Sequence, residues 1–458
     1  MLKTLNNIFR NPSERTVCYV KNKHISESQF CSDVEATIGL IKAYKNENCL
    51  ICIDNPYHFL VALLALLSQK TNAIISANRT EKWLNTIRSD FDFILCDSDF
   101  VSRESVKFEI IMINDLFYEN ESRSKNENYK SNIHFSGDEP LSFFTSGSTG
   151  KAKKIDKTLG YLTNEVETLN KEFGTISVKA RFISSVSHLH IYGLLFYLLF
   201  PLLTRRSWNN SLIEFQEQLS VSLSSDKQNV LISSPAFLSR LDEQQIINGL
   251  EHVFSSGGLL SKYASCLTRI VLRCTPIEVY GSTESGGIAF RQQHGEHQAW
   301  SLFEKINLLA YGDDIELTSP HIGAGNTLIL DDYIEFVGHN QIMLLGRKDR
   351  IVKIGEKRVS LDEIESFIMG IDYIDQCRAV LLSGKRPQVG CVIILSNQGV
   401  KFLDLNGRKE LTEHLKSQMR LRFEATTLPR KWRIVANFPM NSQSKVDIIS
   451  LEALFHTS

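Results

Sequence analysis

Glycines, hydroxyls and lysines crowd into the stretch from Thr145 to Lys154, directly after a hydrophobic run that ends at Phe144. Glycine lets backbone N–H groups turn inward, hydroxyls add hydrogen-bond donors and lysines supply positive charge, so such a loop can hold a polyphosphate. It is not a Walker A loop, which has four residues between its glycines and a Lys-Ser/Thr after the second. Only two residues separate Gly147 from Gly150. Taken alone, the stretch could equally be an exposed polar turn.

Three further motifs follow in order along the chain. They are the pentapeptide Tyr280 to Glu284, the segment Gly346 to Gly355, and Lys445 near the C-terminus. Together with the glycine-rich loop they resemble the core motifs of the adenylate-forming (AMP-binding) superfamily. This superfamily contains acyl- and aryl-CoA synthetases, luciferases and peptide-synthetase adenylation domains. The resemblance covers most of the chain, which looks like a short stand-alone acyl or aryl ligase.

The resemblance implies a large α/β N-terminal domain over residues 1–346, built from layered sheets with helices and a small β-barrel subdomain. A small, mobile α+β C-terminal domain over residues 347–458 would follow. The chain has 458 residues, a length that by itself favours more than one domain. Strand-like runs at Cys49–Ile53 and Phe91–Cys96 flank an apolar helical run at Phe59–Leu67. This alternation predicts a parallel sheet covered by helices.

Composition excludes several classes of function. The formal net charge is −1, with 43% hydrophobic and 22% charged residues, so nothing predicts a nucleic-acid partner or a charged membrane surface. The apolar runs Phe59–Leu67 and Ile191–Leu203 are shorter than the roughly 18 residues of a membrane span, and we expect buried helices. Nine cysteines without a signal peptide predict reduced thiols in a cytoplasmic protein. For the CxxC pair Cys49 and Cys52, core packing is favoured over metal or redox work.

The resemblance also assigns roles around ATP. Thr283 would donate to the α-phosphate, and Glu284 would ligate Mg²⁺, a hard dication that prefers carboxylate and phosphate oxygens. Lys445 would bridge the substrate carboxylate and the α-phosphate or ribose oxygens with its ammonium. These three residues and His190 form the predicted catalytic set. The residues that would hold the β- and γ-phosphates are Thr145, Ser146, Gly147, Ser148, Thr149, Gly150 and Lys153.

The adenosine site and the hinge follow from the same motifs. The residues assigned to adenine and ribose are Gly257, Gly258, Tyr280, Gly281, Asp332 and Arg347. Counting back from Gly346 without gaps selects Asp332 for the ribose hydroxyls, with Asp331 as the alternative. Asp349 would be the hinge about which the C-terminal domain swings. Gly355 would line the channel for the pantetheine thiol, where a side chain would obstruct passage.

The segment Ser187 to Gly193 resembles the family's Pro-x-x-His-x-x-Gly sequence at the mouth of the acyl pocket. On that alignment His190, and not His188, takes the family position, although a histidine beside an apolar helix can also be a core residue. Ile191, Tyr192 and Gly286 would line the pocket. Relatives that activate amino acids place an Asp where Ile191 stands here, and a buried ammonium without a partner is costly. The sequence therefore favours an unaminated acid, either aryl or fatty, with a slight preference for a flat aryl acid.

The thiol could belong to coenzyme A or to the phosphopantetheine arm of an acyl carrier protein. Residues 416–433 contain six basic residues and one acidic residue, Glu424. This excess of positive charge could bind an acidic carrier protein or the phosphates of coenzyme A. It could equally belong to a solvated helix face. The basic residues are Lys416, Arg420, Arg422, Arg430, Lys431 and Arg433. The compact chain resembles the stand-alone ligases that feed carrier proteins, and this resemblance favours a carrier protein as the acceptor.

The overall prediction is an ATP-dependent acid–thiol ligase that releases AMP and diphosphate. A catalytically silent homologue that binds acyl-AMP or nucleotide is the alternative from another class, and a luciferase-type oxidoreductase is a third.

Overall fold

The computed structural model describes residues 1–20, 23–97, 109–113, 132–146, 152–223, 228–293, 299–354, 357–382, 387–439 and 446–456. The chain divides into two compact units. Unit 1 contains Met1–Asn307 and Thr318–Leu328, and unit 2 contains Leu308–Leu317 and Ile329–Ser458. Residues 329–346, which the motifs assign to the N-terminal domain, thus group with the C-terminal part. A functional boundary at Gly346 and Arg347 stays a prediction.

One sheet of unit 1 has the strand order β6-β5-β3-β4-β7-β8, parallel except for the antiparallel pair β7 and β8. Its central strands are apolar and buried on both faces, as strands of a helix-covered parallel sheet must be. The bounds are β3 Asn48–Cys52, β4 Asn72–Ser76, β5 Phe93–Cys96, β6 Glu109–Met112, β7 Pro140–Ser146 and β8 Ala152–Thr158.

The second sheet of unit 1 runs in the order β15-β14-β13-β12-β11-β9-β10-β1-β2. The strands from β1 to β13 are parallel to their neighbours, whereas β2 and β14 pair antiparallel at either side. The bounds are β1 Thr16–Val20, β2 Lys23–Ser26, β9 Arg181–Ser184, β10 Ser207–Leu212, β11 Asn229–Ser233, β12 Leu250–Ser255, β13 Ile277–Ser282, β14 Gly286–Gln292 and β15 Trp300–Leu302.

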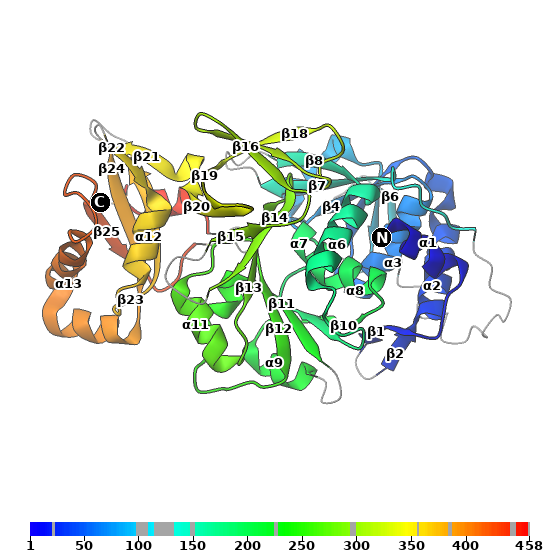
Figure 1. Cartoon of the computed structure of the whole chain (residues 1–458), viewed down its shortest axis with the longest axis horizontal. Coiled ribbons are helices and arrows are strands. Elements are labelled where there is room, and N and C mark those ends of the chain that lie inside the picture. Colours follow the sequence, from blue (N-terminus) through cyan, green and yellow to red (C-terminus); the bar gives the residue numbers. More distant parts are fainter. Residues whose placement is uncertain are drawn as a thin grey trace. The chain divides into compact units, whose positions relative to one another are not determined.

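Helices pack between and around these sheets. Helix α3 (Pro56–Ser68) is buried along most of its length and contacts β3 and β4 of one sheet and β10 of the other. Its first turn is closed by Asn55, whose side chain accepts hydrogen bonds from the N–H groups of Tyr57 and His58. Helix α6 contacts β8 of one sheet and α8 contacts β10 of the other, and the two helices lie side by side in Figure 1. The other helical bounds are α1 Leu2–Arg10, α2 Glu27–Ile41, η1 Lys42–Tyr44, α4 Glu81–Thr86, η2 Arg88–Asp90, α6 Leu159–Phe173, α7 Ile191–Gly193, η4 Leu194–Leu199, α8 Phe200–Leu203, α9 Gln216–Ser222, α10 Pro235–Leu238 and α11 Lys262–Val271.

Unit 2 is built from strands and a few helices. A three-stranded sheet has the order β16-β17-β18, β19 pairs antiparallel with β20, β21 pairs with β22, and β23-β24-β25 form a further sheet. Helices α12 and α13 cover that last sheet through an apolar core that includes Ile364, Ile368, Leu411 and Leu415. The bounds are β16 Asn307–Tyr311, β17 Asp314–Thr318, β18 Thr327–Leu330, β19 Asp332–Gly338, β20 Gln341–Arg347, η5 Lys348–Arg350, β21 Ile351–Ile354, β22 Lys357–Ser360, α12 Leu361–Met369, β23 Ile374–Leu382, β24 Gln388–Leu395, α13 Asn397–Met419, β25 Lys431–Ile434 and α14 Ile448–Ala453.

The predicted apolar runs form the expected elements. The run Phe59–Leu67 lies within α3, and Ile191–Leu203 is helical throughout, with a π-helical turn at Leu194–Leu199. No helix in the ranges described here is both long and apolar enough to cross a bilayer. Cys49 and Cys52 are buried in β3, and burial raises the pKa of the Cys52 thiol to about 12, so both thiols serve as core residues.

Candidate active site

The predicted phosphate loop connects two paired strands. β7 and β8 run antiparallel, with Thr145 opposite Lys153 and Ser146 opposite Ala152. The hairpin therefore brings the start of the loop beside its predicted lysine. The structure does not describe Gly147, Ser148, Thr149, Gly150 or the side chain of Ser146, and their phosphate-binding role stays a prediction from sequence.

The predicted phosphate lysine meets the predicted metal ligand. Lys153 Nζ lies 2.6 Å from Oε1 of Glu284, which belongs to the turn between β13 and β14. Partial burial by itself raises the pKa of Glu284, but the hydrogen bond from Lys153 and other bonds lower it below its usual value. The carboxylate is therefore ionised at neutral pH, as a Mg²⁺ ligand must be.

Glycines and hydroxyls shape the turn that carries Thr283 and Glu284. Ser285 Oγ accepts a hydrogen bond from the N–H of Ser282 at 2.9 Å, and Ser282 Oγ accepts one from the N–H of Ser285 at 3.1 Å. A Cβ atom on Gly281 would lie 2.3 Å from the carbonyl oxygen of Gly286. The close approach of the two strands at this point thus requires glycine. Thr283 is half-buried beside Glu284.

A second lysine of β8, Lys157, lies beneath the same turn. It is 6% exposed, and its Nζ donates to the carbonyl oxygen of Glu284 at 2.7 Å and to that of His321 at 3.1 Å. Burial lowers the pKa of Lys157, while the carboxylates of Glu165 and Glu284 oppose that shift. Lys157 lies outside the motifs recognised in the sequence. The sequence signal for its burial is the strand's alternation, because Lys157 lies two residues after Ile155 and both side chains point to the buried face.

The predicted adenine site lies in the loop after β12. Gly257 has a φ of +83°, in the left-handed region that favours glycine, and a Cβ atom there would meet nothing within 4 Å. A Cβ atom on Gly258 would make only an ordinary contact, 3.8 Å from Cγ of Pro235. Ser256 fastens the loop to β13 by donating its hydroxyl to the carbonyl oxygen of Val279 at 2.8 Å. Tyr280, one residue further along β13, is half-buried, and its ring makes a T-shaped contact with that of Trp300.

The two histidines of the predicted acyl segment have different surroundings. His188 is buried against the ring of Phe59, with Nε2 at 3.1 Å from the carbonyl oxygen of Ile53, and burial lowers its pKa to about 3. His188 is thus a core residue. His190 is half-buried and directly precedes α7, where its carbonyl oxygen accepts the N–H of Leu194.

The predicted acyl-pocket residues lie on two different elements. Ile191 begins α7, and the ring of Tyr192 packs 4.9 Å from that of Phe196 in an aromatic cluster. Burial raises the pKa of Tyr192 well above its ordinary value. Gly286 begins β14, where a Cβ atom would come within 2.7 Å of the side chains of Glu165 and His321. Its missing side chain therefore permits this packing, and its place in an acyl pocket stays a prediction.

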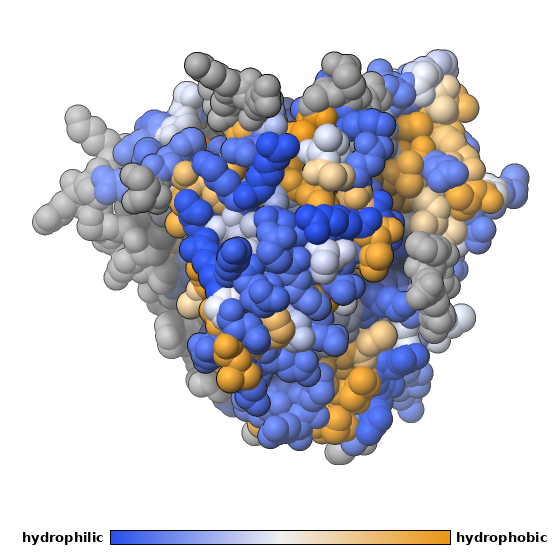
Figure 2. Space-filling model, turned by 90° about the vertical axis from the view of Figure 1, so that its left-hand side faces the viewer, coloured by the Kyte–Doolittle hydropathy of each residue, from blue (hydrophilic) through white to orange (hydrophobic). Residues whose placement is uncertain are grey.

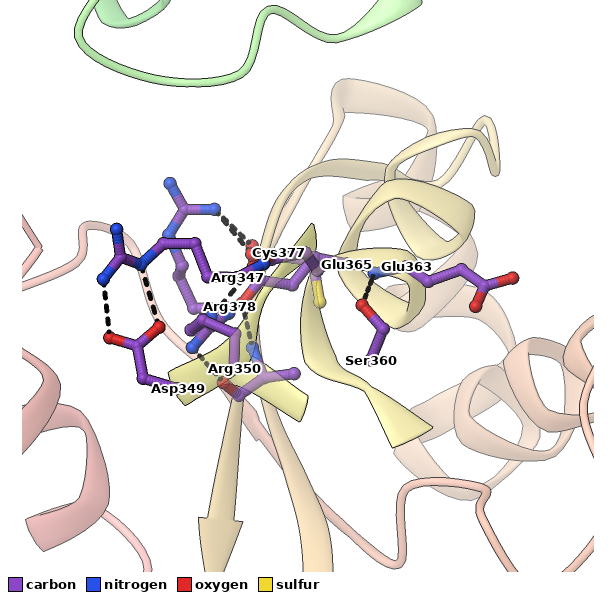
Figure 3. Close-up of polar contacts among 10 residues, drawn as sticks. Arg347, Asp349, Arg350, Ser360, Glu363, Glu365, Cys377 and Arg378 are labelled. Carbon is purple, nitrogen blue, oxygen red and sulfur yellow. Dashed lines mark hydrogen bonds and ion pairs between the residues drawn. The ribbon is translucent and has the colours of Figure 1, made fainter. Parts of the chain in front are cut away.

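Arg347, assigned to the ribose, and Asp349, the predicted hinge, lie together in unit 2 (Figure 3). Arg347, the last residue of β20, is opposite Asp332 in the strand pair. Its guanidinium donates to both carboxylate oxygens of Asp349, at 2.8 and 3.0 Å, and lies 3.8 Å from the carboxylate of Asp331. The hydrogen bonds to Asp349 raise the pKa of Arg347. Both ribose candidates, Asp331 and Asp332, thus lie beside Arg347.

The residue after the predicted hinge is fixed to the rest of unit 2. Figure 3 shows Arg350 reaching the buried carboxylate of Glu365, which also accepts hydrogen bonds from Arg378 at 2.9 Å and from the N–H of Ala379 at 2.7 Å. Arg350 Nε further contacts Asp362 at 2.8 Å. The segment from Arg350 onward is therefore held to α12 and β23. Gly355 and Lys445 lie outside the described residues, and their predicted roles rest on the sequence.

The residues present fit a Mg²⁺ ion that accompanies a nucleotide. In the described part of the chain, no three His, Cys, Asp or Glu side chains gather closely enough to hold a metal by themselves. Mg²⁺ characteristically takes one or two carboxylates from protein and its other oxygens from phosphates and water. The single ionised carboxylate of Glu284, beside a phosphate-loop lysine, matches that donor set.

Comparison with known proteins settles the family. A model of AMP-binding enzymes matches residues 9–307, about two thirds of the chain. The chain belongs to the AMP-binding enzyme family. The resemblance to the adenylate-forming superfamily and the α/β architecture expected from it are thereby confirmed, and this AMP-binding enzyme is a ligase that joins an acid to a thiol.

Relatives of this AMP-binding enzyme include both carrier-protein and coenzyme A ligases. A D-alanine–D-alanyl carrier protein ligase of Staphylococcus aureus is 22% identical over 410 residues, 81% of each chain. A 4-coumarate–CoA ligase of Halorhodospira halophila is 26% identical over 323 residues, 68% of this chain and 75% of that one. Among solved structures, the o-succinylbenzoate coenzyme A synthetase of Bacillus subtilis, in complex with ATP and magnesium ion, superposes with a TM-score of 0.79. It is 15% identical, with 96% of this chain and 97% of that chain covered.

Proposed function

We propose that the enzyme uses ATP and Mg²⁺ to convert an unaminated aryl or fatty acid into an acyl-AMP, and then transfers the acyl group to a phosphopantetheine thiol. The observation that carries the proposal is the contact of 2.6 Å between Lys153 and Glu284. These residues come from two motifs 131 positions apart, and the fold brings their opposite charges together beside the phosphate-loop hairpin. When ATP and Mg²⁺ bind, the lysine could leave the carboxylate and bind the triphosphate, and the carboxylate could bind the metal ion.

The reaction has two steps. An oxygen of the carboxylate attacks the α-phosphorus of ATP, and the bond to the bridging oxygen breaks as diphosphate leaves. The thiol sulfur then attacks the carbonyl carbon of the acyl-AMP, AMP leaves, and the thiol proton is released. The first step brings a carboxylate against the charge of a triphosphate, so positioned cations and donors lower its barrier.

The described residues supply part of this electrostatic environment. Lys153 would bind the outer phosphates, Thr283 would donate to the α-phosphate, and Glu284 would hold Mg²⁺, which neutralises phosphate charge when bound. His190 lies at the start of α7, beside the predicted acyl residue Ile191. From sequence alone, Lys445 would approach the reacting carboxylate and Gly355 would admit the thiol after rotation about Asp349.

The argument for an unaminated acid depends on Ile191. An α-ammonium group beside this aliphatic side chain would lose its hydration without gaining a partner, which is costly. The relatives point both ways, because one is named for D-alanine and another for 4-coumarate. At 22% and 26% identity neither fixes the substrate, so the residue at position 191 is the more direct guide.

A carrier protein is favoured over coenzyme A as the acceptor. The carrier-protein ligase aligns along 81% of this chain, which supports a carrier. The basic segment of residues 416–433 supports it less, because part of its charge is neutralised or used internally. Lys416 pairs with Glu413, Arg422 pairs with Glu363, and Arg433 donates to the carbonyl oxygen of Leu454. Arg420, Arg430 and Lys431 are exposed. The side of the molecule that carries α13 is mainly hydrophilic (Figure 2), as suits a polar partner.

The test is to detect both products by mass spectrometry. The enzyme is incubated with ATP, Mg²⁺ and a mixture of benzoate-like, cinnamate-like, fatty and amino acids, and acyl-AMP is identified by mass. Coenzyme A or an acyl carrier protein bearing phosphopantetheine is then added to separate samples. We expect an acyl-AMP of an unaminated acid and thioester on the carrier. Absence of every acyl-AMP, with the protein folded, would contradict the proposal, and thioester on coenzyme A alone would correct the acceptor.

A further inference from the structure

A buried polar network lies beneath the turn that carries Glu284. It contains Lys157 of β8, Glu165 of α6, and His321, which are 6%, 4% and 1% exposed. His321 Nε2 lies 3.1 Å from the hydroxyl oxygen of Thr168, one helical turn beyond Glu165 on α6. Burying ionisable groups removes their hydration and is costly unless they are paired and hydrogen-bonded. Apolar side chains could fill the same space without this cost, so the polar groups point to a function that requires them.

The network holds the main chain of the turn at Glu284 and again three residues after it. Lys157 Nζ donates to the carbonyl oxygen of Glu284 itself, at 2.7 Å. Three residues later the N–H of Gly287 donates to Oε1 of Glu165, at 2.7 Å. Between them Gly286 has a φ of +69°, and a Cβ atom there would come within 2.7 Å of Glu165 and His321. The turn is thus pressed against the network and bonded to it at two points.

Lys153 and Lys157 hold different parts of Glu284. Lys153 is largely exposed and contacts the carboxylate, where a metal ion and a nucleotide could replace it. Lys157 is buried, and its two carbonyl contacts are to main-chain oxygens, so both bonds can persist when the carboxylate changes partner. A main chain fixed in this way leaves the Glu284 side chain fewer orientations. Ligands oriented by surrounding groups bind their metal more tightly, typically by about 10–100-fold.

We propose that Lys157 and Glu165 are positioning residues that fix the Thr283–Glu284 turn for binding of the magnesium–nucleotide complex. The inference rests on the proposed function, in which Glu284 is the Mg²⁺ ligand. It predicts that the two residues act on the metal and nucleotide and leave the affinity for the carboxylic acid unchanged.

The experiment compares the full-length wild-type protein with Lys157→Met, Glu165→Gln and the double variant. ATP binding is measured by calorimetry over a range of Mg²⁺ concentrations, without any acid present, and thermal unfolding is recorded for each protein. We expect Lys157→Met and the double variant to need about tenfold more Mg²⁺ for half-maximal ATP binding. Lys171→Met is the matched control, because Lys171 lies on α6 and pairs only at the surface with Glu304 in the described contacts. It should bind as the wild type does.

The double variant is the control for loss of folding in the single variants. Removing one partner leaves a buried charge, whereas removing both charges together is often tolerated. A folded double variant with wild-type dependence on Mg²⁺ would overturn the inference, since the network would then serve packing alone. Weaker ATP binding that is independent of Mg²⁺ would also overturn it. If the wild type itself binds no ATP in the presence of Mg²⁺, the proposed function fails first, and that outcome is distinct from both.

Discussion

Replacing Glu284 with Gln should separate catalysis from stability. The substitution keeps the size of the side chain and removes the charge that would hold Mg²⁺. Removing one positioned charge-stabilising group typically lowers a rate by about 10²-fold, or about 2.7 kcal/mol of transition-state stabilisation. We therefore expect acid-dependent exchange of diphosphate into ATP to fall by about 10²-fold or more at wild-type Mg²⁺ concentrations.

The expected change in stability is much smaller. The ion pair that disappears joins side chains that are 56% exposed for Lys153 and 29% exposed for Glu284. Pairs of this kind contribute about 0–1 kcal/mol, so the unfolding midpoint should move by no more than about 2–4 °C. The bonds from Lys157 to the main chain of Glu284 and from Ser282 to Ser285 do not involve the carboxylate and should persist.

Lys153→Met is the matched variant, because it removes the same ion pair from the other side. Its stability should match that of Glu284→Gln, but its defect should be in ATP affinity at saturating Mg²⁺. Glu284→Gln should instead show a raised Mg²⁺ requirement. The assays are thermal unfolding and exchange measured over matrices of ATP and Mg²⁺ concentrations. Full exchange activity in Glu284→Gln would refute the assignment of Glu284 as the metal ligand. An unfolding midpoint lowered far beyond about 2–4 °C would refute the claim that the substitution affects catalysis and not stability.

Three further predictions follow from other parts of the chain. Lys445→Ala should lose adenylation yet convert supplied acyl-AMP to thioester, and Gly355→Leu should do the reverse; parallel loss of both half-reactions in both variants would exclude alternation of the domain. Asp349→Pro restricts φ at the predicted hinge and should resemble one of those two variants when both half-reactions are measured. Burial lowers the pKa of His188 to about 3, so between that pH and about 6.5 the unfolded chain binds a proton that the folded chain does not. Stability should therefore fall as the pH drops through this window, by up to about 1.4 kcal/mol per pH unit, and urea unfolding of His188→Gln should show a weaker dependence.

Much of the fold follows from patterns that are local in the sequence. The apolar run within α3 and the short strands β3 and β5 have the lengths of buried elements, and the parallel sheet follows from their alternation. The sequence of residues 1–40 is polar and mixed, yet this part of the chain forms α1, β1, β2 and most of α2. Helix α1 buries Leu5, Ile8 and Phe9, a helical spacing that was available in the sequence.

The site was predictable where residue type and chemistry coincide. The motifs assign Lys153 to the outer phosphates and Glu284 to Mg²⁺, and the structure places the lysine against that carboxylate. Lys157 was not predictable in the same way. Its partners are carbonyl oxygens 127 and 164 residues away. Every residue type has a main-chain carbonyl, so the sequence does not show which residues accept these bonds. The pairing of Arg347 with Asp349 was also not foreseen, because sequence assigns the first to ribose and the second to a hinge.

The central claim is that this enzyme activates an unaminated acid by adenylation, and acid-dependent exchange of labelled diphosphate into ATP tests it most directly. Benzoate-like, cinnamate-like and fatty acids are assayed beside the proteinogenic amino acids and D-alanine, with Glu284→Gln as the inactive control. We predict exchange with one or more unaminated acids and none with α-amino acids. Robust exchange with an amino acid, and none with any unaminated acid, would contradict the account.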